Sequence, residues 1–149
     1  MIRRRTRVRA AVMSSAAAAK LTVYVCPKLA AAIELTTRFI ENIRGAIGEL
    51  EARRGSLSEA TLEVERRAYT SLLSTANTLV EDTTRIYEML CSEANPTQYT
   101  LYRAAHMLSR ILSRLRYGHS PRLPAHIVAL LHEANKHLAE AAHGGGSVA

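Results

Sequence analysis

The chain has 149 residues and a formal net charge of +7, and 48% of its residues are hydrophobic. This length fits one domain, and that share of apolar side chains can fill a core. Because no run of about 18 uncharged apolar residues is present, we expect no transmembrane helix. Cys26 and Cys91 are too few for a disulfide-rich scaffold, so they form either one bridge or, more commonly for such a pair, two buried apolar side chains.

The positive charge is distributed unevenly along the chain. Residues 1–33 contain seven basic side chains and no acid, whereas residues 34–149 contain 13 basic and 13 acidic groups. The net charge therefore belongs to the N-terminal segment, which we interpret as a basic arm on a neutral body. The body is itself polarised, since residues 34–93 carry a net charge of −4 and residues 94–149 a net charge of +4.

The arm opens with five arginines within residues 3–9, and residues 10–19 contain only Ala, Val, Met and Ser. Alanine favours helix, so we expect a helix from Arg7 to about Val25, with arginines on all its sides. Such an arm suits enclosure by phosphates, and neutralising about seven of them gives a log–log salt slope of roughly −6. A mitochondrial transit peptide, a twin-arginine signal and a disordered solubilising tail are the alternative interpretations.

The rest of the chain predicts helices, because apolar residues recur at three- and four-residue steps. The first expected helix covers residues 29–54, with Pro27 suited to its first turn and Gly55 as its stop. Ser56 and Glu59 fit a capping box for the second helix, which ends before Pro96. The last two helices are expected over about residues 97–117 and 124–142.

We expect the glycines at positions 144–146 to end the last helix. Only Leu21 to Val25 alternate with the period of a strand. The chain is therefore predicted to be all-α, with a basic N-terminal helical arm followed by an antiparallel four-helix bundle. The arm covers residues 1–28, the bundle residues 29–143, and a Gly-rich tail residues 144–149.

The expected helix over residues 97–117 carries a second basic stripe. Arg103, Arg110 and Arg114 fall within about 40° of one another on a helical wheel. Ala104, Leu108, Ile111 and Leu115 face the opposite way, toward the expected core. The arginine stripe either contacts further phosphates or pairs with the acidic helices of the same or a neighbouring subunit.

Signals for catalysis and metal binding are weak. His126, Glu133, His137 and Glu140 share one helical face, yet only adjacent pairs are close enough to share an ion. We therefore expect no metal site, and a polar stripe that faces solvent or another subunit. Arg114 and His119 match the R-x4-H pattern of HEPN-type RNA-cleaving bundles. No phosphate-binding loop, nucleophile elbow or aspartate pair is visible, so we expect neither an enzyme nor a cofactor or small-molecule substrate.

A basic, Ala-rich N-terminal arm before a compact neutral helical body resembles the major capsid proteins of filamentous archaeal double-stranded DNA viruses (tristromaviruses, lipothrixviruses and rudiviruses). This resemblance implies dimers, of one protein or of two paralogous ones, whose arms wrap A-form DNA and which stack into a helical filament. It also implies a location in the virion, and in the host cytoplasm during assembly. The scarcity of amides and the surplus of charged helix formers indicate a hyperthermophilic source, and a GC-rich genome is the alternative explanation of the bias toward Arg and Ala.

The expected DNA contacts follow from the resemblance and from the two basic stripes. Those in the arm are Arg3, Arg4, Arg5, Arg7, Arg9, Lys20 and Lys28, and those outside it are Arg103, Arg110 and Arg114. The alternative function is that of a helical RNA-binding or RNA-cleaving module, such as the small subunit of a CRISPR effector complex or a HEPN-type nuclease.

Overall fold

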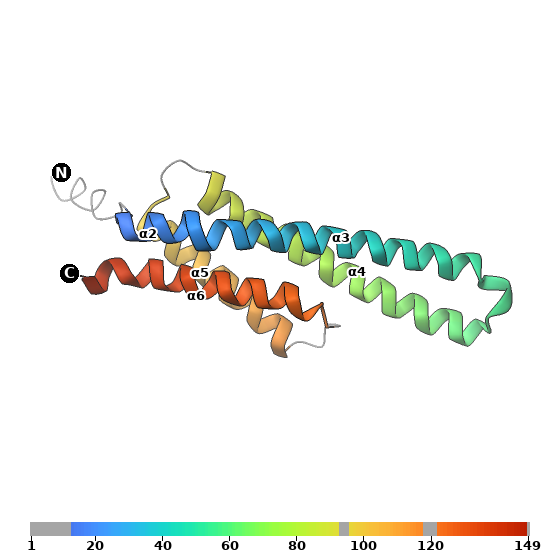
Figure 1. Ribbon diagram of the computed structural model, residues 1–149. Coiled ribbons are helices and arrows are strands. Elements are labelled where there is room, and N and C mark those ends of the chain that lie inside the picture. The colour runs from blue at the N-terminus through green and yellow to red at the C-terminus, as the bar shows by residue number, and fades with distance from the viewer. Residues whose placement is uncertain (1–12, 93–95, 118–121, 149) are drawn as a thin grey trace, which may run out of the picture.

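The structure of the protein is a computed structural model that describes residues 13–92, 96–117 and 122–148. Over these ranges the fold is all-α, as predicted, and contains no strand. Successive long helices alternate in direction, so that the chain forms a long hairpin followed by a shorter one (Figure 1).

The first helix is longer than the sequence predicts. The helix α2 (Ser15–Lys20), the π-helical segment η1 (Leu21–Val25) and the helix α3 (Cys26–Ala52) follow one another without a break. The strand-like pattern of η1 is therefore misleading, and the backbone N–H of Cys26 donates to the carbonyl of Leu21, five residues back. Pro27 lacks an N–H and its ring crowds the preceding turn, and the wider π turn allows the helix to continue past it.

The beginning of this helix belongs to the body of the protein. Ala17, Leu21 and Val25 are buried in the main core, where α2 and η1 pack on α6 (Ala125–Val148). No structural break therefore appears at residue 28, the expected boundary between arm and bundle. The arginines at positions 3–9 lie outside the described residues.

The composition of this helix bears on the expectation that the chain has no transmembrane helix. The helix Ser15–Ala52 is long and apolar enough, by length and composition alone, to cross a membrane. Lys20 and Lys28 interrupt the apolar stretch, which is why it contains no uncharged run of the expected length. A core helix of a soluble protein passes the same test, and one side of this helix packs on α6.

The long hairpin consists of α3 and α4 (Glu59–Tyr87), joined through the 3-10 turn η2 (Arg54–Ser56). The predicted capping box at Ser56 is wrong, because the Ser56 hydroxyl donates to the Arg53 carbonyl within this turn at 2.9 Å. The helix begins later, and Ser58 Oγ accepts the backbone N–H of Thr61 at 3.2 Å. Most residues at the three- and four-residue steps of these two helices are buried: Thr36, Ile40, Ile43, Leu50, Leu62, Ala76, Leu79 and Ile86.

The shorter hairpin consists of α5 (Gln98–Tyr117) and α6, and follows the π-helical end of α4, η3 (Glu88–Ser92). Of the residues expected to face the core on α5, Ala104, Leu108 and Ile111 are buried and Leu115 is partly buried. The apolar row of α6 is buried: Ile127, Leu131, Ala134, Leu138 and Ala141. The predicted stop at residue 144 is wrong, because α6 runs to Val148. Glycine ends a helix where it adopts a positive φ, and no described glycine does so.

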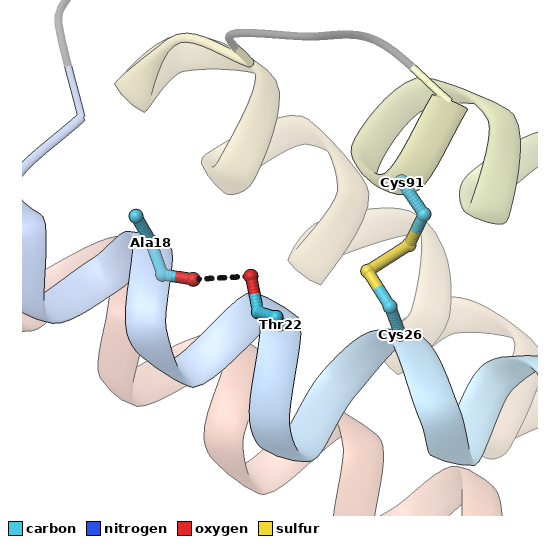
Figure 2. Close-up of a disulfide and its surroundings, with 4 residues drawn as sticks. All are labelled: Ala18, Thr22, Cys26 and Cys91. Atoms are coloured by element: carbon cyan, nitrogen blue, oxygen red, sulfur yellow. Dashed lines mark hydrogen bonds between the residues drawn. A yellow bond between two sulfur atoms is a disulfide. The ribbon is translucent and has the colours of Figure 1, made fainter.

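A disulfide joins Cys26 at the start of α3 to Cys91 in η3, so the interpretation of two reduced, buried cysteines is wrong (Figure 2). The Cα atoms of the two residues are 6.0 Å apart. The bond is possible because α3 has 27 residues and α4 has 29, so the antiparallel hairpin returns the chain to the level at which it began.

We expect the double variant Cys26→Ser/Cys91→Ser to lose up to about 4 kcal/mol of unfolding free energy, because a bond between residues 65 apart restricts the unfolded chain. Urea denaturation, with and without a reductant, measures this loss. The reductant should destabilise the wild type and leave the double variant unchanged. Equal stability of the oxidised wild type and the variant would contradict the expectation.

Candidate nucleic-acid interface

Lys20 is the first of the expected phosphate contacts that the structure describes. It ends α2, and its Nζ lies 3.3 Å from Glu140 Oε1 of α6. Both side chains remain partly exposed. The lysine charge is therefore partly neutralised within the protein, and the contact fixes the N-terminal helix to α6.

Glu140 belongs to a cluster that joins η1 to α6. The ring of Tyr24 stacks on His137, with 4.5 Å between the ring centroids and an interplanar angle of 17°. His137 Nδ1 lies 3.3 Å from Glu140 Oε1, and its Nε2 lies 3.9 Å from Glu133 Oε2. The hydrogen bond from Lys20, together with the lysine charge and His137, outweighs burial and lowers the pKa of Glu140.

This cluster corrects the expectation for one member of the polar stripe of α6. His126, Glu133 and Glu140 are exposed, as expected, whereas the His137 side chain is only 18% exposed, because Tyr24 covers it. Sequence reasoning missed this contact. Lys20 and Tyr24 lie four residues apart and thus on one helical face, but their contacts with α6 depend on how the N-terminal helix packs on the body.

The arginine stripe of α5 divides into two kinds of residue. Arg114 donates from Nη2 to Asp82 Oδ2 of α4 at 2.8 Å, and the Asp82 side chain is 21% exposed. For Arg114, pairing with an acidic helix of the same chain is therefore observed. Arg103 and Arg110 are exposed and make no ion pair with any described residue. They lie on one side of α5, about 10 Å apart along the helix axis.

The start of α5 is held against the end of α6. The side-chain amide of Gln98 donates to the carbonyls of Ala141 and Ala142, and Tyr102 Oη lies 3.1 Å from His143 Nδ1. Figure 1 shows that this end of the molecule also holds the start of α2. The arginine-rich residues 1–12 therefore join the body at the end where α5 begins, which is the end that bears Arg103.

Two expectations remain without a structural counterpart. Lys28 lies in the first turn of α3, is partly buried and makes no ion pair with the residues that the structure describes. Of the R-x4-H pair, Arg114 contacts Asp82, and His119 lies outside the described residues. Among the described residues, no group of three His, Cys, Asp or Glu side chains is arranged to hold a metal ion.

The lowered pKa of Glu140 gives a prediction for acid stability. A carboxylate whose pKa falls on folding stabilises the fold above its usual value of 4.5, and this contribution disappears as the pH falls through the lowered pKa. We expect Glu140→Gln to lower the thermal midpoint at pH 7, and the gap to the wild type to close between about pH 5 and pH 3. Thermal unfolding at several pH values measures this. Glu41→Gln, at an exposed position with no ion pair among the described residues, serves as control, and a pH-independent gap for Glu140→Gln would contradict the assignment.

Comparison with protein families, with curated proteins and with solved structures finds no match to this chain. A function for the protein is therefore argued from its own charges and contacts.

Proposed function

We propose that the protein is a structural nucleocapsid protein, which binds double-stranded DNA without sequence specificity and polymerises with itself or with a paralogous protein into a helical filament. The observation that carries the proposal is the separation of charge. The first 12 residues contain five arginines and no acid, and the helix that follows them is anchored in the core of a body with balanced charge. Binding through such a segment depends on phosphate neutralisation and reads no base sequence.

The proposed architecture is a basic arm on an antiparallel four-helix bundle. The alternating directions of α3, α4, α5 and α6, and the burial of their apolar rows, support the bundle. Because α2 and η1 pack on α6, we assign the DNA-wrapping role of the arm to residues 1–12. Residues 15–28 act as its anchor.

Several contacts hold this anchor, residues 15–28, firmly to the body of the protein. Ala17 and Leu21 are buried, Lys20 contacts Glu140, and the disulfide holds the start of α3 against η3. Tension on a DNA-bound arm is therefore resisted by the core of the body. Disulfides also occur in intracellular proteins of hyperthermophiles, which fits the expected hot source.

Arg103 and Arg110 supply a second contact in this proposal. They lie on α5, are exposed, and have no acidic partner among the described residues. Arg114 is held by Asp82, so it is less available to an external phosphate. The same contact disfavours the RNA-cleaving alternative, which needs the Arg114 guanidinium at a scissile phosphate.

Removal of residues 1–12 tests the arm and keeps every residue of the described core. Each phosphate contact contributes about 0.9 to the salt slope, so the loss of five arginines should flatten the slope by roughly 4 to 5. Fluorescence anisotropy with a short duplex of mixed sequence, over a series of salt concentrations, measures the slope. An unchanged slope would refute the role of the arm. Truncation to residue 20 is a poorer test, because it also removes Ala17 and Lys20.

Assembly on DNA has a direct readout in negative-stain images. The full chain mixed with long duplex DNA should form filaments of constant width, and the chain that lacks residues 1–12 should not. Isolated or irregular complexes with the full chain would contradict a nucleocapsid role, even where the affinity for DNA is high.

We expect the double variant Arg103→Ala/Arg110→Ala to flatten the salt slope by about 2, because two phosphate contacts are lost. The matched control is Arg38→Ala/Arg67→Ala, which removes two arginines that already pair with Glu34 and Glu63 on their own helices. The same anisotropy titration measures both variants. Equal slopes for the two double variants would place the second contact elsewhere.

A further inference from the structure

The long hairpin projects beyond the helices that cover it. α3 and α4 have 27 and 29 residues, whereas α5 has 20, and α6 packs on α5, α3, α2 and η1. Figure 1 shows the turn between α3 and α4 far from α5 and α6. We call residues 43–72 the distal hairpin. Its buried residues Ile43, Leu50 and Leu62 lie outside the main core cluster, so they pack between two helices only.

One side of α4 changes from covered to uncovered along its length. Thr61, Ala68, Thr75 and Asp82 follow one another at seven-residue steps and so share a stripe. At the C-terminal end of this stripe Asp82 binds Arg114 of α5, and Thr75 and Thr78 line a hollow with Ile111 and Leu115. At the N-terminal end nothing in the described chain covers it, and Thr61 and Ala68 are exposed.

The uncovered side includes an exposed large apolar residue. Val64 lies one turn from Ala68 and is 67% exposed, more than the other large aliphatic residues described. A stripe of α3 behaves similarly. Ala32 is buried and Phe39 packs on the main core, whereas Ala46, one further heptad along, is only partly buried and lies outside that core. A small, partly apolar face of the distal hairpin thus continues the face that α5 and α6 cover elsewhere along α3 and α4.

The charges of the distal hairpin suit a second copy of the same chain. Residues 43–72 contain five basic and five acidic groups, so the +7 of the chain lies entirely outside them. Two copies that meet here therefore avoid the repulsion between their basic ends. Glu49, Arg53 and Glu65 make no ion pair with described residues. In a contact about a two-fold axis, each of these side chains can pair with an opposite charge of the other copy, and symmetry forms every such pair twice.

We propose that this uncovered face of the distal hairpin, formed by Thr61, Val64 and Ala68 of α4 with Ala46 of α3, is an interface between two copies of the chain. The copies pair about a two-fold axis, so that two distal hairpins together form a four-helix arrangement. The inference deepens the proposed function, since it names the surface through which copies meet. It does not require DNA.

The test compares Ala68→Arg with Thr70→Arg in the full chain. Arg at position 68 places two like charges and two bulky side chains in the interface, and should raise the dimer dissociation constant about tenfold or more. Thr70 is exposed on the other side of the same helix, so its substitution should leave the constant unchanged. Sedimentation equilibrium over a concentration series, without DNA, measures both. Because both positions are exposed, both variants should keep the wild-type thermal midpoint.

The outcomes separate this inference from the proposed function. Ala68→Arg should retain the wild-type salt slope on a short duplex, and the chain without residues 1–12 should still dimerise. A wild type that stays monomeric throughout the series, or equal dissociation constants for Ala68→Arg and the wild type, would overturn the inference. Loss of self-association on removal of residues 1–12 would also overturn it, because the arm would then hold the interface. Dimerisation without DNA binding would refute the proposed function alone.

Discussion

The fold depends on how the N-terminal helix passes Pro27. A proline inside a helix removes one hydrogen bond and crowds the preceding turn, and the π turn at Leu21–Val25 accommodates both effects. The helix can therefore extend backwards to Ser15 and bury Ala17, Leu21 and Val25 against α6. Tyr24, which stacks on His137, lies within the same turn. Without this passage, residues 15–25 would be joined to α3 by a hinge rather than by a continuous helix.

The positive charge is concentrated in one part of the molecule, away from the distal hairpin. The end of the molecule at which α2 and α5 begin carries Lys20 and Arg103, whereas the distal hairpin carries equal numbers of acids and bases (Figure 1). Within the body, several arginines are used internally, as with Arg66, which pairs with Glu51 across the hairpin at 2.8 Å and lowers the pKa of that carboxyl. Exposed pairs of this kind contribute little to stability individually. Their larger effect is to leave only a few arginines, among them Arg103 and Arg110, for contacts outside the chain.

The sequence was sufficient to predict which residues are buried where the spacing of apolar residues along one helix decides it. Ala104, Leu108 and Ile111, and the row from Ile127 to Ala141, are buried because apolar spacing alone fixes which side of a helix faces the core. It was insufficient where the outcome depends on a partner distant in the chain. The cysteine bridge requires the register of the α3–α4 hairpin, and the binding of Arg114 by Asp82 requires the position of α5 on α4. The continuation of the helix from Val25 into α3 was missed because Pro27 also suits the first turn of a new helix.

The two proposals constrain each other geometrically. If the copies meet through their neutral distal hairpins, the opposite ends of the two copies, which carry Lys20 and Arg103, point away from each other. Each dimer then contacts DNA at two separated places, rather than through one continuous basic surface. Two separated, sequence-independent contacts on one rigid dimer bind more strongly together than singly, provided that the duplex can reach both. Such a dimer favours a wrapped or closely stacked duplex over an extended one, and the same spacing repeated from dimer to dimer is what a filament of constant width requires.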